Sequence, residues 1–273
     1  MFTQNAFATT AASLPDGFLR WYLIVMIAAV VIGTLVDIIH KASARYFFAS
    51  WGGGKARRKR ELGGGDLVGI AVQTALVDVA TSAEFCNPRR RIAHLLTMYG
   101  FILYVVATLC LVFAYGNVAT PGIWPTLWWV GALMVLVGCY WFWFFIRVDV
   151  AAEGNTPLRF VKADLFVVSM MVSVTLGVIW AWRGGGAGWL FWLYLLATAV
   201  LFFGVPWSKF AHMFFKPAAA FDKRVSKANG TAENLPLQSR EDPEQQKRHS
   251  MELLRDAPMD MGLGIKREAP RHY

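Results

Sequence analysis

Hydrophobic residues in this chain gather into five long runs that are separated by polar segments. The runs cover residues 21–39, 93–115, 124–146, 163–182 and 188–212. Each is close to the roughly 20 apolar residues that a helix needs to cross a membrane. Because a backbone in lipid must satisfy its own hydrogen bonds, runs of this length predict helices. The pattern therefore predicts an all-α integral membrane protein, a five-helix transmembrane bundle over residues 19–215.

The polar segments divide the rest of the chain. Residues 1–18 form a short lead before the first run. Residues 66–84 carry apolar positions at helical spacing together with acidic ones, which predicts an amphipathic helix at the membrane surface. Residues 216–273 are rich in charge, proline and glutamine. A segment of that composition is expected to be disordered until a partner binds it.

Basic residues are unevenly placed. Of the 27 lysines and arginines, 25 lie in segments that alternate spans put on one side, and only Arg20 and Arg183 lie on the other. By the positive-inside rule, the N-terminus is outside and the C-terminus is cytoplasmic. An odd number of spans agrees with this. The net charge of +9 is then an orientation signal that also contacts anionic lipid, and nucleic-acid binding is not expected.

Glycine and tryptophan clusters mark further positions. Two glycine triplets, 52–54 and 63–65, flank the basic cluster 55–60 and predict flexible hinges. An aromatic belt is expected at the external membrane interface. Its members would be Trp124, Trp128 and Trp129.

Histidines are the strongest candidates for chemistry. His94 begins the second run and His212 ends the fifth, at matching depths on the cytoplasmic side. Ionisable groups in apolar segments are costly and usually functional. Two imidazoles on neighbouring helices fill both axial positions of a haem iron. We therefore predict one haem b between them, although either histidine alone is equally typical of a polar residue at a membrane boundary.

The surroundings of the two histidines suit a haem. Arg90 and Arg91 stand just outside the first ligand, and Lys209 lies near the second. Such cations would pair with haem propionates. Gly100 lies further along the second run, where the absence of a side chain would let a flat macrocycle approach the backbone.

A second candidate pair lies at the end of the first run. Asp37 and His40 are three residues apart, on one helical face at the same membrane boundary. A carboxylate beside an imidazole can exchange protons with a quinone. The same arrangement is also typical of polar residues that end a helix.

Two sequence motifs resemble a known family. The segment RRIAHLLTMYGF (90–101) resembles the start of the second helix in the membrane cytochrome b family typified by the respiratory nitrate reductase gamma subunit. The segment PWSKFAHMFFK (206–216) is similar to the end of its fifth helix. The resemblance covers about residues 20–216. Within the family, the short single-domain form with a polar tail looks most like the membrane anchor associated with adenylylsulfate reductase in sulfur-oxidising bacteria.

The resemblance implies a function. Family members carry electrons between membrane quinone and a cytoplasmic flavin/iron–sulfur oxidoreductase, here in a bacterial inner membrane. Fuller members hold two b haems; where the second histidine pair would fall, this chain has Tyr104 and Tyr194. The resemblance thus implies a single haem b, held by His94 and His212. Two alternatives stay open, a haem-free quinone-binding anchor and a non-redox membrane protein.

Overall fold

The computed structural model shows a helical membrane protein. It describes residues 2–40, 43–83, 85, 87–116, 118–147, 156, 158–161, 164–205 and 216–231. Every regular element in these ranges is a helix. Four helical stretches are long and apolar enough to cross a membrane. They are α2 (Phe18–His40), α5 with its π-helical end η2 (Pro88–Leu109, Cys110–Ala114), α6 with η3 (Ile123–Trp141, Phe142–Ile146) and α8 (Leu165–Trp182).

The fifth apolar helix is shorter than the sequence suggests. α9 covers Trp189–Gly204, 16 residues, or about 24 Å, whereas a bilayer core is about 30 Å thick. Residues 206–215 lie outside the described residues. Four of the predicted spans are therefore present as long helices, and the fifth stays a prediction.

Helices α5 and α6 pack as an antiparallel pair through glycines. A Cβ atom at Gly131 would lie 2.6 Å from Tyr104 N, and one at Gly100 would lie 2.8 Å from Val135 N. At Gly138 it would lie 2.8 Å from Ala93 O. Contacts this short with backbone atoms show that only glycine fits. The two backbones therefore approach closely, as they commonly do between membrane helices.

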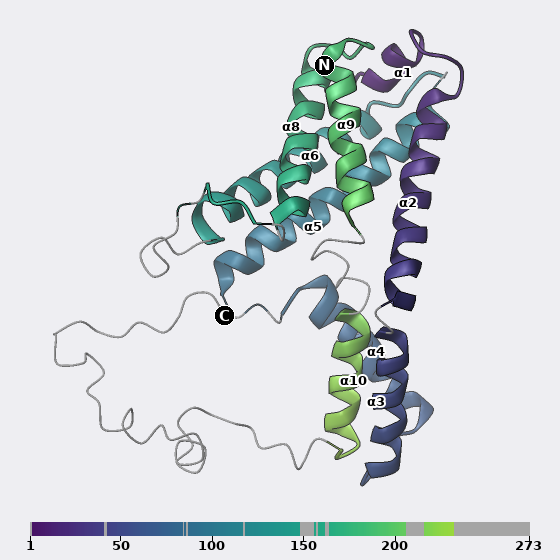
Figure 1. Cartoon of the computed structure of the whole chain (residues 1–273), viewed down its shortest axis with the longest axis vertical. Coiled ribbons are helices and arrows are strands. Elements are labelled where there is room, and N and C mark those ends of the chain that lie inside the picture. The colour runs from purple at the N-terminus through teal and green to yellow at the C-terminus, as the bar shows by residue number, and fades with distance from the viewer. Residues whose placement is uncertain are drawn as a thin grey trace, which may run out of the picture.

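The other long helices complete the bundle (Figure 1). α8 packs antiparallel to α9, with Trp180 stacked on Tyr194 at 5.5 Å between ring centres. α9 runs parallel to α2, and Tyr22 Oη donates to Leu195 O at 2.6 Å. The chain thus alternates in direction from one apolar helix to the next. The end of the bundle that holds the start of α5 and the end of η3, with Arg89, Arg90, Arg91 and Arg147, is called here the basic end.

Many large apolar side chains stay exposed along the long helices. On α2, Ile32 is 60% and Ile39 is 77% exposed. A contiguous apolar surface of this kind is unusual in a protein surrounded by water. Lipid tails would cover it, which agrees with a multi-pass membrane protein.

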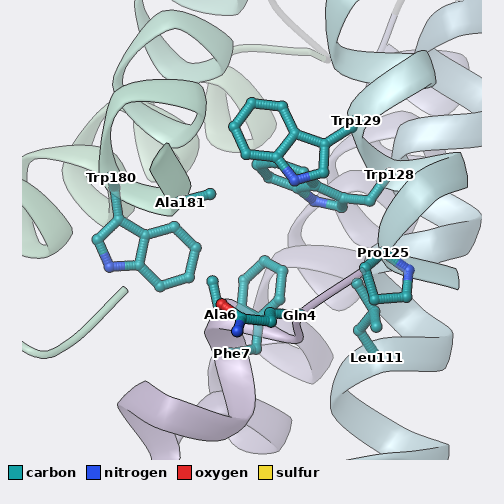
Figure 2. Close-up of a pocket in the computed structure, with 9 residues that line it drawn as sticks. All are labelled: Gln4, Ala6, Phe7, Leu111, Pro125, Trp128, Trp129, Trp180 and Ala181. Atoms are coloured by element: carbon teal, nitrogen blue, oxygen red, sulfur yellow. The ribbon is translucent and has the colours of Figure 1, made fainter. Parts of the chain in front are cut away.

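The N-terminal lead closes the end opposite the basic end. It contains α1 (Ala6–Ala11), whose N-cap Asn5 donates through Nδ2 to Leu111 O and Tyr115 O, each at 3.1 Å. Phe7 of this helix sits among aromatic rings (Figure 2). Trp128 and Trp129 are buried there, so the aromatic belt predicted for them is wrong. The N-terminal lead covers their rings, and Phe7 of α1 packs against Trp128.

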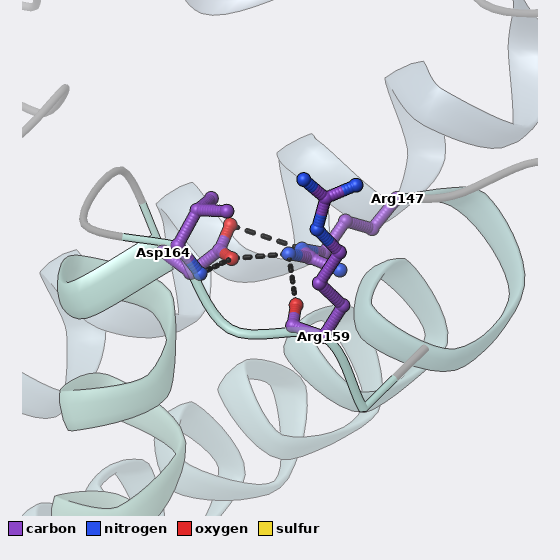
Figure 3. A network of polar contacts seen from close by, with 4 residues as sticks. Arg147, Arg159 and Asp164 are labelled. Carbon is purple, nitrogen blue, oxygen red and sulfur yellow. Dashed lines mark hydrogen bonds and ion pairs between the residues drawn. The ribbon is translucent and has the colours of Figure 1, made fainter. Parts of the chain in front are cut away.

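An ion pair joins η3 to α8 at the basic end (Figure 3). Arg147 Nε donates to Asp164 Oδ1 at 2.9 Å, and its Nη2 donates to Asp164 Oδ2 and, at 2.6 Å, to Arg159 O. The guanidinium also lies 4.3 Å from the Trp143 ring centre. Both charged side chains are largely buried. Bidentate bonding of this kind offsets much of the cost of removing the two charges from water.

Three further helical segments gather beyond the basic end (Figure 1). They are α3 (Ser43–Arg57), α4 with its π-helical continuation η1 (Gly64–Gln73, Thr74–Ala80) and α10 (Lys216–Ala228). The predicted amphipathic helix is present, but it ends at Ala80. The predicted hinge at residues 52–54 is wrong, because these glycines lie inside α3.

Helix α10 corrects the expectation of disorder from residue 216 onward. Phe221 stacks on Trp51 of α3 at 5.7 Å, and Val225 is buried. Arg224 forms two hydrogen bonds to the Asp78 carboxylate, at 2.6 and 2.9 Å. Phe221 and Val225 thus dock this segment, although its overall composition is polar. Residues 232–273 lie outside the described residues.

Substituting Gly131 tests the close packing of α5 and α6. A leucine there would push against Tyr104 N and Gly100 O, so we expect Gly131→Leu to lower the free energy of unfolding by about 1–3 kcal/mol or more. Thermal unfolding of the detergent-solubilised protein measures the loss. Gly69→Ala in α4 is the control, because nothing lies within 4 Å of a Cβ there. Equal unfolding temperatures for wild type and Gly131→Leu would contradict this packing.

The docking of α10 should depend on pH. The Arg224 guanidinium lowers the pKa of the Asp78 carboxyl group below its usual value. The stabilisation by this pair is therefore present above the ordinary aspartate pKa of about 4 and is lost as the pH falls through the lowered value. We expect amide exchange in α10 to accelerate only at pH below about 4.

The Asp78→Asn variant should show fast exchange in α10 already at neutral pH, without the acid step. Glu61→Gln is the matched control, since Glu61 pairs with Arg58 on the exposed surface. Exchange in α10 that is slow and equal in wild type and Asp78→Asn at neutral pH would refute the role of the pair.

Candidate functional site

Helix α5 begins at the basic end with a capped first turn. Asn87 Oδ1 accepts hydrogen bonds from Arg89 N at 2.9 Å and Arg90 N at 3.4 Å. Pro88 occupies the first helical position, where its missing N–H is not needed. This start places His94 six residues into the helix, on its exposed surface.

A turn that follows η1 lies against His94. Ser82 Oγ is 3.2 Å from His94 Nδ1. The Phe85 ring lies 4.9 Å from the imidazole, tilted by 39°. Ser82 is buried and has a φ angle of +49°. That conformation is uncommon for a residue other than glycine, and it occurs most often where surrounding contacts enforce it.

Two further hydrogen bonds hold this turn against α5. Arg91 Nε donates to Thr81 O at 2.8 Å, and Tyr99 Oη donates to Ala80 O at 2.6 Å. These bonds lie on either side of His94 along the helix. The position of the imidazole is therefore determined by contacts with residues 80–85 as well as by α5.

The contact of Ser82 with His94 suits a metal-binding orientation of the imidazole. Ser82 Oγ lies 3.4 Å from Val79 O and 3.2 Å from His94 Nδ1. A neutral imidazole has one N–H and one lone pair, so the tautomer of His94 decides which group donates in this contact. In the tautomer with the proton on Nδ1, the serine accepts and Nε2 carries the lone pair. Metal-binding histidines are commonly oriented in this way, through a hydrogen bond from the nitrogen that does not bind.

The predicted neighbours of His94 divide into two groups. Arg90 Nη2 donates to Ile146 O at 3.4 Å, and Arg91 is bonded to the turn. Each guanidinium has five N–H groups, so both retain donors for an anion. Gly100 does not fit its predicted role. It faces α6, where Met134 and Val135 fill the space above it, so no macrocycle approaches the backbone there.

Lys216, the first described residue after His212 in the sequence, lies beside this site. Lys216 Nζ lies 5.2 Å from the centre of the Phe85 ring, which contacts His94. His212 and Lys209 lie outside the described residues. Lys216 is a cation near the imidazole that the sequence did not single out.

Helices α5 and α9 meet deeper in the bundle. Tyr104 Oη and Tyr194 Oη form a hydrogen bond of 2.8 Å, and both side chains are buried. Phe101 and Phe202 lie 6.3 Å apart between ring centres. Tyr104 and Tyr194, which stand where the resemblance places a second pair of histidines, are therefore in contact.

The tyrosine pair sets the register between the two helices. His94 precedes Tyr104 by ten residues, and His212 follows Tyr194 by eighteen. On a straight helix the first separation is about 15 Å. His212 lies outside the described residues, so the equal depth of the two histidines stays a prediction.

Asp37 and His40, the second candidate pair, lie in different surroundings. Asp37 is 3% exposed, whereas His40 is exposed at the last position of α2. Thr34, one turn before Asp37, is also buried. The polar face at the end of α2 therefore consists of Thr34 and Asp37, and the two predicted partners do not share one environment.

Sequence patterns did not reveal Ser82, Phe85 or Tyr99 as neighbours of His94. Ser82 and Phe85 belong to a turn without periodicity, and Tyr99 lies in an apolar run where it resembles any interfacial aromatic residue. Only the folding of the turn back onto α5 brings them together.

Comparison of the chain with models of protein families, with curated proteins and with solved structures finds no match. Among the described residues, no group of three or more histidine, cysteine, aspartate or glutamate side chains is arranged to hold a metal ion. A haem held by two histidines needs no such group.

Proposed function

We propose that this protein is a membrane anchor and electron-transfer subunit. It connects a cytoplasmic flavin/iron–sulfur oxidoreductase with the membrane quinone pool through one haem b, held by His94 and His212. The contact that carries this proposal is the hydrogen bond of 2.8 Å between Tyr104 and Tyr194. It makes direct neighbours of α5, which bears His94, and α9, which precedes His212.

The geometry favours a haem position at the basic end. A Cβ atom at Gly177 would lie 2.9 Å from both Tyr104 Oη and Tyr194 Cε2, so the deeper position is filled by packed phenol rings. Chain length allows the second ligand to reach the first. His212 is four residues from Lys216, a span of at most about 14 Å, and Lys216 contacts the ring beside His94.

The residues around His94 suit an iron porphyrin. Ser82 Oγ can accept the proton of Nδ1, which is the arrangement that a histidine uses when it binds iron through Nε2. Arg90, Arg91 and Lys216 are cations within its surroundings. Arginine pairs well with carboxylates such as propionates. When bound, a haem with two histidine ligands supplies one-electron transfer without an open coordination site.

The basic end suits two further partners. Its arginines would attract anionic lipid and an acidic protein surface, the latter with a marked dependence on salt. Helices α3, α4 and α10 extend beyond the bundle on this side and offer a surface for a soluble enzyme. Among candidate partners, adenylylsulfate reductase of sulfur oxidation has the support of the resemblance, which also implies a bacterial inner membrane.

The visible spectrum of the purified protein tests the haem. Wild type should show a b-type reduced-minus-oxidised spectrum with one haem per chain. His94→Ala and His212→Ala should abolish it, because each removes an axial ligand, while His40→Ala should leave it unchanged. A wild-type protein without such a spectrum would favour the haem-free quinone-binding anchor. Two haems per chain would contradict the filling of the deeper position by tyrosines.

A matched pair of variants tests the role of Ser82. Ser82→Ala removes the hydroxyl group that is hydrogen-bonded to Nδ1, and loss of such a support typically weakens metal binding about 10- to 100-fold. Thr81→Ala is the control, because the Thr81 hydroxyl donates to Val77 O and does not contact His94. Equal haem occupancy in the two variants during haem titration would show that Ser82 does not orient the ligand.

Reporter fusions test the orientation. A fusion after residue 216 should be cytoplasmic and one at residue 120 external, since the basic residues flank the first position. If both fusions reported the same side, the proposed haem and the partner surface would no longer share the cytoplasmic face, and the proposal of a cytoplasmic partner would fail.

A further inference from the structure

An apolar pocket lies between α2, α5 and α9, outside the site at His94. It is lined by side chains from residues 19–27 of α2, 104–109 of α5 and 194–202 of α9, together with Val112 of η2 and Phe7 of α1. No charged side chain lines it. The polar side chains in its lining are those of Tyr22, Tyr104, Tyr194, Thr108 and Thr198.

The three phenol groups are gathered together. Tyr22 Oη donates to Leu195 O at 2.6 Å, and Tyr22 is close enough to the other two tyrosines to interact with them electrostatically. The remaining hydroxyls in the lining, on Thr108 and Thr198, donate to Tyr104 O and Tyr194 O at 2.8 Å. The lining is therefore apolar except at one cluster of hydroxyl groups.

The hydrogen bonds of this cluster leave capacity for a ligand. A hydroxyl group donates one proton and accepts through two lone pairs. The single bond between Tyr104 and Tyr194 uses one of their two protons. The second proton, and lone pairs on all three phenol oxygens, remain available to a third group in the pocket or to the neighbouring Thr198 hydroxyl.

These properties select the chemistry of the ligand. An acyl chain has no group for the hydroxyls, and an anion would meet no cation. A quinone carbonyl accepts the phenol proton, and a quinol hydroxyl donates to a phenol oxygen, so the same cluster suits both redox forms. We propose that this pocket binds the ring edge of a membrane quinone, with a carbonyl directed at Tyr104 and Tyr194.

The size and walls of the pocket agree with partial entry of the ring. Its volume is about 60 Å³, enough for the edge of a ring, and the tail would lie along the exposed apolar face of α2. Tyr22 and Phe18 hold α2 against α9 beside the pocket.

This position differs from the pair at the other end of α2. Asp37 lies fifteen residues beyond Tyr22, about 22 Å along the helix. Tyr104 lies about 15 Å along α5 from His94, on the side away from the basic end. The inference rests on the proposed function only in taking quinone as the substrate.

Photolabelling tests the site in the full-length protein in lipid nanodiscs. The probe is an azido-substituted benzoquinone with a decyl tail. Labelled peptides should come from the pocket segments of α2, α5 and α9. Labelling confined to residues 36–40 would overturn the proposal. So would equal displacement of the probe by decylbenzene, which has the tail but no carbonyl and would indicate a site for apolar chains.

The double variant Tyr104→Phe, Tyr194→Phe should weaken binding of the probe roughly five- to tenfold, by loss of about one hydrogen bond. Removing both partners of one bond leaves no unpaired group, so the fold should persist. Tyr140→Phe is the matched control, because Tyr140 bonds Thr175 on the exposed surface. Leu23→Trp keeps the hydroxyls but fills the pocket, and it should abolish labelling. Unchanged binding in both pocket variants would overturn the proposal.

The visible spectrum recorded on the same samples separates this inference from the proposed function. A protein with no b-type spectrum but with label in the pocket would retain the quinone site and lose the haem. A protein with an intact spectrum and no label in the pocket would retain the haem and lose this site.

Discussion

The close approach of α5 and α6 is the constraint on which the rest of the bundle depends. Gly100, Gly131 and Gly138 allow the two backbones to touch, at distances that would exclude any Cβ atom. In lipid, where no hydrophobic effect drives helices together, such van der Waals contact is a main source of stability. Tyr104 lies one turn beyond Gly100 on this seam, against Gly131 and Trp128 of α6, and its hydroxyl group reaches Tyr194 of α9. Gly100, which was expected to let a haem approach the backbone, instead holds α5, the helix that carries His94, against α6.

Helix α5 then serves two regions of different chemistry. At the basic end, His94 lies among arginines and a turn that orients its ring through Ser82. Deeper in the bundle, Tyr104 and Tyr194 provide a polar cluster inside an apolar pocket. A redox centre near a charged surface and a site for an apolar substrate within the bilayer are the two ends that an electron-transfer subunit must connect. The proposals for haem and quinone place them on one helix.

The helices beyond the basic end show how polar segments become ordered. α10 carries few apolar residues, yet Phe221 and Val225 lie one helical turn apart, Phe221 stacks on Trp51 of α3, and Val225 is buried. The bidentate pair of Arg224 with Asp78 adds a directional contact. Mean composition predicts disorder for such a segment, whereas the spacing of a few residues and one ion pair suffices to dock it. This layer also brings Lys216 to the ring beside His94.

The hydrophobic pattern alone determined the helical class and four of the five predicted apolar helices, because lipid leaves a long apolar segment little choice but a helix. It also predicted a helix at residues 66–84, which the structure has at residues 64–80. It also placed His94 near the start of α5. Only the tertiary structure decided that Gly100 faces α6, that Trp128 and Trp129 lie under α1, and that Ser82 contacts His94. Those facts depend on which helix faces meet and on how a turn folds back. Such contacts join residues far apart in sequence, where no local pattern records them.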